Sequence, residues 1–182
     1  MKHVYKSTLT VFVALFVLVL GACNTSVDED NTSGTHNTSE ETPSTMKKAE
    51  NPKFKDGEEV IVKADHMEGM KNAEGEVIKS FDTIAYVVTY TPTNGEDKVK
   101  DHKWVVQEEI KDAGNDEIPA GSDVVLEADH MEGMKGAEAH IENSEKTTVY
   151  MIDYKPTDED MSMSDKVVKN HKWVTEEELE AK

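Results

Sequence analysis

An internal duplication constrains this 182-residue chain more than any other feature. The octapeptide ADHMEGMK, Ala64–Lys71, recurs without a change as Ala128–Lys135. The segment HKWV, His102–Val105, recurs as His171–Val174, so the second copy carries five extra residues between its two motifs. Because fixed internal repeats define the units of a fold, we divide the core into repeat one (residues 57–111), a linker (112–120) and repeat two (121–182).

Each repeat predicts short β-strands. Apolar side chains alternate with other residues at Tyr86, Val88 and Tyr90, and turns are indicated at Gly69 and Asn94. We therefore expect a mainly β protein with two tandem small SH3- or KOW-like barrels. A copy of this size is near the lower limit for an independent core, so we expect the two copies to support one another.

The ends of the repeats add two expectations. Trp104 and Trp173 are expected to close one core each, because each follows a strand-like segment at the same position of its repeat. The acidic segments 108–111 and 176–179 are expected to form a short helical turn after that strand.

The first 22 residues predict export. Lys2 and Lys6 precede an apolar run that ends at Leu20 and is short for a stable membrane span, which is typical of a secretory signal. Leu20–Cys23 resembles the lipobox of bacterial lipoproteins. That resemblance implies cleavage before Cys23, lipidation of its thiol and anchoring at the extracytoplasmic face of the membrane. The alternative is an uncleaved anchor with an incidental cysteine.

A polar segment follows, over residues 23–56. It is rich in Asn, Thr, Ser and Glu, with little to bury besides Val27 and Phe54. Such a composition cannot compensate for the entropy of ordering, so we expect a disordered tether.

Charge narrows the class of partner. The formal net charge is −18, and all 20 basic residues are lysines. A nucleic-acid binder needs cations that neutralise phosphate, and it favours arginine for bidentate contacts. The composition therefore argues against nucleic acids and anionic lipid surfaces, and it fits a cation as partner. With one cysteine, the chain forms no internal disulfide and no cysteine-based zinc site.

The octapeptide combines donor atoms that suit copper. His66 supplies an imidazole, and Met67 and Met70 supply thioethers across the turn at Gly69. Thioether sulfur selects Cu(I), and imidazole binds both Cu(I) and Cu(II). The full candidate set includes the equivalent residues of repeat two, the HKWV histidines and two loop methionines: His66, Met67, Met70, His102, His130, Met131, Met134, Met161, Met163 and His171.

Structural roles remain open for part of this set. Met70 and Met134 suit a core equally well, because methionine fills irregular gaps. His102 and His171 either complete a metal site or cap a strand. No enzyme motif is present, and the many carboxylates are interpreted as a solvated acidic face, so we expect a protein without catalytic activity.

The lipobox, the polar tether and the paired motifs HMEGMK and HKWV resemble the YdhK/CopL-type surface lipoproteins of Gram-positive bacteria. The resemblance covers residues 57–182 and implies tandem DUF1541 domains and, for some members, extracytoplasmic copper binding and copper tolerance. Two hypotheses follow. The first is a tethered protein that buffers or sequesters copper, with a copper efflux pump as a partner. The second is an interaction module that binds a cell-wall polymer or a surface protein.

Overall fold

Antiparallel β-structure dominates the computed structural model, which describes residues 41–157 and 167–182. All of these residues belong to one compact unit. The predicted mainly β class is confirmed, and the described part of the chain contains no α-helix. Its elements are β1 (Lys47–Lys48), β2 (Glu59–Val62), β3 (Glu74–Thr91), β4 (Val99–Val106), η1 (Gln107–Glu109), β5 (Asp123–Val125), β6 (Glu138–Lys155), β7 (Val168–Thr175), η2 (Glu176–Glu178) and β8 (Leu179–Ala181), where η marks a 3₁₀ turn.

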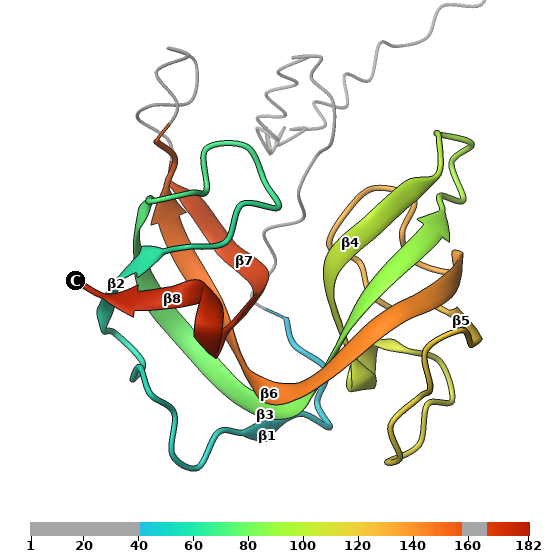
Figure 1. The fold of residues 1–182 in the computed structure, drawn as a ribbon, viewed down its shortest axis with the longest axis horizontal. Helices are drawn as coiled ribbons and strands as arrows, with labels where there is room; N and C mark the ends of the chain where they lie inside the picture. The colour runs from blue at the N-terminus through green and yellow to red at the C-terminus, as the bar shows by residue number, and fades with distance from the viewer. Residues whose placement is uncertain (1–40, 158–166) are drawn as a thin grey trace, which may run out of the picture. The chain divides into compact units, whose positions relative to one another are not determined.

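Two 18-residue strands organise the sheet. β3 from repeat one and β6 from repeat two pair antiparallel along their whole lengths, from Glu74 opposite Lys155 to Thr91 opposite Glu138. Figure 1 shows them running side by side and bending along their course. Two register shifts interrupt the pairing, after Val77 and after Val87. Such irregularities bend strands and increase their twist.

The shorter strands pair so that each end of the sheet contains both repeats. β2 pairs with the start of β3 and with β8, while β7 pairs with the end of β6. We call this group, with the segments between its strands, the β2 lobe. β5 pairs with the start of β6, and β4 pairs with the end of β3. This group, together with η1, is the β5 lobe.

This pairing differs from the expected division into one barrel per repeat. The β2 lobe takes β2 from repeat one but β7 and β8 from repeat two, and the β5 lobe has the reverse composition. Neither repeat closes on itself, so the mutual support expected of two small copies takes the form of exchanged strands.

Three buried clusters form the core. One fills the β2 lobe, one fills the β5 lobe, and the third lies around the middle of β3 and β6. Trp104 and Trp173 are both buried in this third, central cluster. The expectation that each tryptophan closes the core of its own repeat is therefore wrong, because the two side chains share one core.

The expected tether also needs correction where the structure describes it. Within residues 41–56, β1 pairs with the middle of β3, and Phe54 is 1% exposed. The Phe54 ring packs edge-on against Tyr150, with 5.9 Å between centroids. Disorder up to residue 56 is thus wrong for this segment, because one large aromatic side chain and a short strand tie it to the sheet. The expected helical turns are present as η1 and η2.

Candidate functional site

The octapeptide forms the same tight turn in both copies. The Met70 amide donates to the Met67 carbonyl oxygen at 3.2 Å, and Met134 does the same to Met131 at 3.2 Å. The glycine inside each turn has positive φ, +75° at Gly133, a conformation that side-chain-bearing residues rarely adopt. The turn predicted around this glycine is confirmed.

Each turn is held by the opposite repeat. The Thr157 amide of repeat two donates to the carbonyl oxygen of Gly69 in repeat one, at 2.9 Å. The Thr93 amide of repeat one donates to the carbonyl oxygen of Gly133 in repeat two, also at 2.9 Å. The pairing of β3 with β6 therefore also places the segment that follows the long strand of one repeat beside the octapeptide of the other.

The same exchange brings two histidines together in the β2 lobe. His66 from the first octapeptide and His171 from the second HKWV segment have their Nε2 atoms 3.1 Å apart. The rings are stacked, with centroids 5.3 Å apart and an interplanar angle of 26°. His171 is buried, and the Tyr154 ring packs edge-on against it at 5.6 Å. These two residues are separated by 105 positions in the chain.

Burial affects the protonation of His66 in this pair. Desolvation lowers the pKa of His66, although the carboxylate of Glu178 opposes the shift. A neutral imidazole carries a lone pair, which a metal ion requires. The environment of His66 therefore favours the form that can act as a ligand.

The β5 lobe contains the equivalent pair, His130 and His102, in a different arrangement. Their ring centroids are 6.3 Å apart, with an interplanar angle of 38°. His130 is buried, and its Nε2 lies 2.7 Å from Oε1 of Glu109 rather than against the second imidazole. The two lobes therefore share their residues but differ in what the octapeptide histidine contacts.

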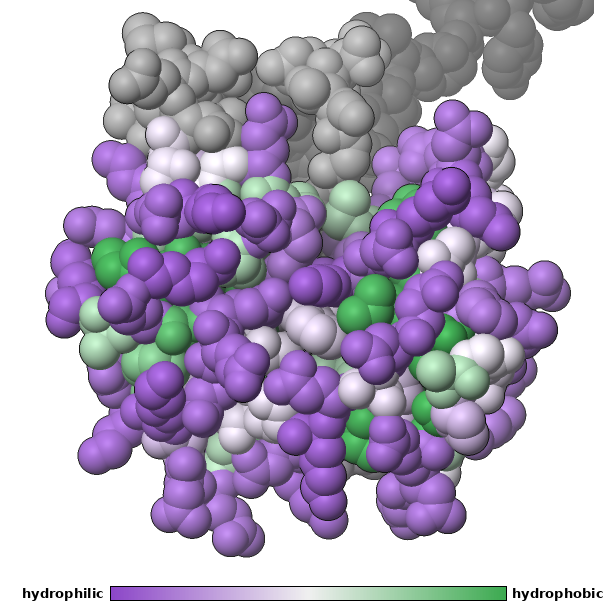
Figure 2. Space-filling view, viewed as in Figure 1, coloured by the Kyte–Doolittle hydropathy of each residue, from purple (hydrophilic) through white to green (hydrophobic). Residues whose placement is uncertain are grey.

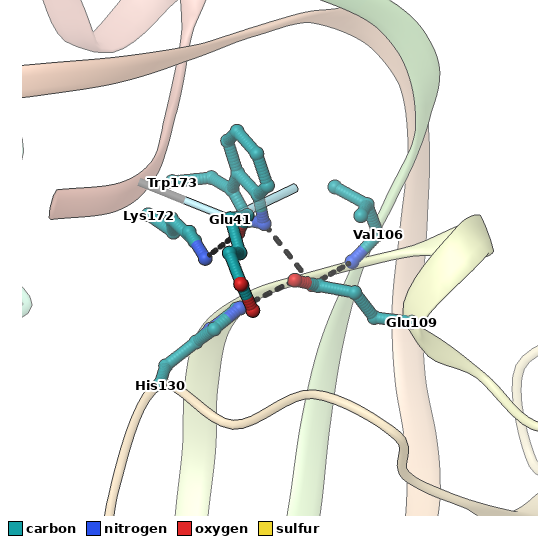
Figure 3. A network of polar contacts seen from close by, with 6 residues as sticks. All are labelled: Glu41, Val106, Glu109, His130, Lys172 and Trp173. Carbon is teal, nitrogen blue, oxygen red and sulfur yellow. Dashed lines mark hydrogen bonds and ion pairs between the residues drawn. The ribbon is translucent and has the colours of Figure 1, made fainter. Parts of the chain in front are cut away.

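Glu109 is the buried carboxylate at the centre of this second arrangement. Its Oε2 accepts hydrogen bonds from the Trp173 indole at 3.0 Å and from the Val106 amide at 3.2 Å. Figure 3 shows these donors and His130 converging on the carboxylate. Burial alone would raise the pKa of Glu109, but the charge and hydrogen bond of His130 outweigh it, together with the other two donors. The pKa lies below its usual value, so Glu109 is ionised.

Glu109 was not among the residues predicted from the sequence, where the carboxylates were interpreted as a solvated acidic face. This one is 4% exposed. Its position could have identified it as a repeated residue, because Glu109 and Glu178 each follow the histidine of their HKWV segment by seven residues. Glu178 accepts from the Trp104 indole at 2.8 Å, so both carboxylates bind the tryptophan of the opposite repeat.

Each octapeptide histidine has one buried ring nitrogen without a hydrogen bond among the described residues. These nitrogens are Nδ1 of His66 and Nδ1 of His130, the same atom of the same motif in both lobes. A buried polar atom without a partner costs about 1–3 kcal/mol. In His130 this atom is the ring nitrogen left for a ligand, because Nε2 is already in contact with Glu109.

The methionines divide into two groups. Met70 and Met134 are 0% exposed inside the clusters of their lobes, which fits the packing role that the sequence left open. Met67 and Met131 are partly buried and pack against these clusters. Met161, Met163, the signal segment and Cys23 lie outside the described residues.

Large hydrophobic side chains are rarely exposed on the described surface. Hydrophilic residues predominate on the face in Figure 2, and among described residues the exposed large hydrophobics are Val125 and Val167. Within residues 41–157 and 167–182, no group of three or more His, Cys, Asp or Glu side chains is arranged to hold a metal ion by itself. In the same ranges, no helix is long and apolar enough to cross a membrane.

The family model described as "Protein of unknown function (DUF1541)" matches residues 56–107 and 120–176. The chain belongs to the DUF1541 family. The two matched segments correspond to the two sequence repeats, so both histidines of each pair lie within DUF1541 sequence.

Relatives of this DUF1541 protein include a curated protein and solved structures from Bacillus subtilis. The uncharacterized protein YdhK of strain 168 is 50% identical over 189 aligned residues, which cover 97% of this chain and 90% of YdhK. A 2.00 Å crystal structure of YdhK matches with a TM-score of 0.75 and 56% identity, covering 79% of this chain and 95% of that one. A solution NMR structure of the YdhK C-terminal domain matches with a TM-score of 0.65 and 58% identity, over 71% of this chain and 94% of that one.

Proposed function

We propose that this DUF1541 protein binds copper outside the cytoplasm, held at the membrane through lipidated Cys23, and buffers or sequesters the ion. The observation that carries the proposal is the His66–His171 pair, with two Nε2 atoms 3.1 Å apart. A metal ion about 2.0 Å from each nitrogen needs them about 3.3–4 Å apart, depending on the angle at the metal. A small rotation of either ring therefore makes room for a shared ion.

The surrounding groups favour copper over harder ions. Met67 packs against the β2-lobe cluster, which includes Tyr154, and Tyr154 contacts the His171 ring. A thioether in the same octapeptide turn as His66 suits Cu(I), whereas Mg²⁺ and Ca²⁺ need several oxygen ligands. A protein of this kind would act beside a copper efflux pump, either by passing the copper ion to the pump or by holding the ion nearby.

The test is a competition titration of the purified protein against a Cu(I) chelator. His66→Gln and His171→Gln should each weaken Cu(I) binding at one site by at least about tenfold. The double variant should lose little more, because residues that act together at one site are non-additive. Met67→Leu should weaken binding while preserving the fold, since the two side chains have similar volume.

His140→Gln is the matched control. This histidine is exposed, and its Nδ1 is paired with Asp123 at 2.9 Å, outside both histidine pairs. The His140→Gln variant should bind Cu(I) as tightly as the parent protein does. Circular dichroism confirms that every variant is folded. If the two pair variants also bind like the parent, the copper proposal fails and the interaction-module hypothesis moves ahead.

A further inference from the structure

We infer that Glu109 is a positioning residue that makes His130 bind the metal through Nδ1, so that the two lobes coordinate copper through different atoms. This inference rests on the proposed copper function and specifies the site in the β5 lobe. It starts from the contact between Nε2 of His130 and Oε1 of Glu109, at 2.7 Å.

The contact with Glu109 determines which ring nitrogen of His130 carries the proton. Trp173 and Val106 already donate to the Glu109 carboxyl group, and an imidazole is a stronger base than a carboxylate, so in the short contact the proton belongs to Nε2 of His130 and Oε1 of Glu109 accepts it. In the neutral imidazole the lone pair is then on Nδ1. That atom is buried and has no hydrogen-bond partner among the described residues.

Glu109 itself is locked in one orientation. Its Oε2 accepts hydrogen bonds from the Trp173 indole N–H and the Val106 amide N–H, and neither N–H group can act as an acceptor. A buried histidine that gives one ring N–H to a carboxylate and its other nitrogen to a metal is a recurring second-shell arrangement. The neighbouring imidazole is His102, whose ring centroid is 6.3 Å away.

The β2 lobe provides an internal comparison. Glu178 occupies the position equivalent to Glu109, and its Oε2 accepts from the Trp104 indole and the Thr175 amide. There, however, Nε2 of the octapeptide histidine lies against His171. The carboxylate that contacts the octapeptide histidine in one lobe therefore binds the tryptophan and Thr175 in the other.

The substitution Glu109→Gln should reverse the tautomer. The two donors at Trp173 and Val106 require the amide oxygen of the new side chain. Its NH₂ group then faces Nε2 of His130, which must become an acceptor, so that the proton moves to Nδ1. A purely structural role for Glu109 would not predict this change.

The experiment is long-range ¹H–¹⁵N NMR of the histidine rings in the purified protein, before and after adding Cu(I) alone. In the parent we expect the His130 proton on Nε2, and Cu(I) should shift the Nδ1 signal most. Glu109→Gln should move the proton and weaken Cu(I) binding in the β5 lobe by about 10–100-fold. Glu109→Asp, which retains a carboxylate, should restore part of that affinity.

Glu178→Gln is the matched control and should leave the His130 signals unchanged. A proton on Nδ1 in the metal-free parent, or a Cu(I) shift confined to Nε2 of His130, would overturn the inference while leaving copper binding intact. If Cu(I) shifts no histidine signal in either lobe, the proposed function fails and the metal part of the inference fails with it. If Glu109→Gln does not fold, the parent spectra alone still decide the tautomer and the ligating atom.

Discussion

At the scale of single residues, burial is what distinguishes the octapeptide histidines from the exposed His140. Desolvation lowers the pKa of His66, because a charged imidazole loses its hydration inside the protein. As the pH falls below about 6.5, histidine in the unfolded chain takes up a proton before His66 of the folded chain does. The unfolded state then binds more protons, so the free energy of unfolding falls with decreasing pH.

We therefore predict that the metal-free protein loses stability as the pH falls from about 6.5 to the lowered pKa of His66. One group contributes a slope of at most about 1.4 kcal/mol per pH unit. His66→Gln should flatten this dependence, and His140→Gln should not. Urea denaturation at a series of pH values measures the slopes, and equal slopes in the parent and His66→Gln would contradict the assignment.

The sequence predicted the histidines of the candidate site but not its buried carboxylate. The octapeptide marked His66 and His130 because it recurs without a change. Glu109 was missed because a carboxylate in a chain with 38 acidic residues has no local signal of burial. Its burial depends on Trp173 and His130, which other parts of the chain supply.

At the scale of elements, β4 and β7 connect the lobes to the central cluster. Trp104 near the end of β4 and Trp173 near the end of β7 are 6% and 0% exposed there. The alternation at Tyr86, Val88 and Tyr90 predicted strand structure in β3. The sequence could not predict which strands pair, because two repeats with the same motifs offer similar local sequence to either pairing.

We predict that Trp104→Ala lowers the free energy of unfolding by roughly 3–5 kcal/mol, the usual cost of truncating a large buried aromatic residue. Trp173→Ala should cost a similar amount. Because both side chains share one cluster, each variant should still unfold in a single transition. Denaturant titration followed by two probes tests this, and a midpoint that does not move would remove Trp104 from the core.

At the scale of the whole molecule, the exchange of strands makes the two repeats one folding unit. β3 and β6 pair over their full lengths, and each lobe needs strands from both repeats. Both histidine pairs are also assembled across the repeats. Stability and the candidate metal sites therefore depend on the same inter-repeat contacts.

We predict that neither repeat folds alone as a monomer. Residues 41–115 lack β7 and β8, which complete the β2 lobe, and residues 116–182 lack β2, β3 and β4. Each fragment should be unfolded or should form a symmetric dimer in which a second copy supplies the missing strands. Mixed, the two fragments should assemble one to one, because β3 and β6 then recover their pairing. Light scattering and amide NMR spectra of the separate and mixed fragments measure this, and a well-dispersed spectrum from a monomeric single repeat would show that the exchanged strands are dispensable.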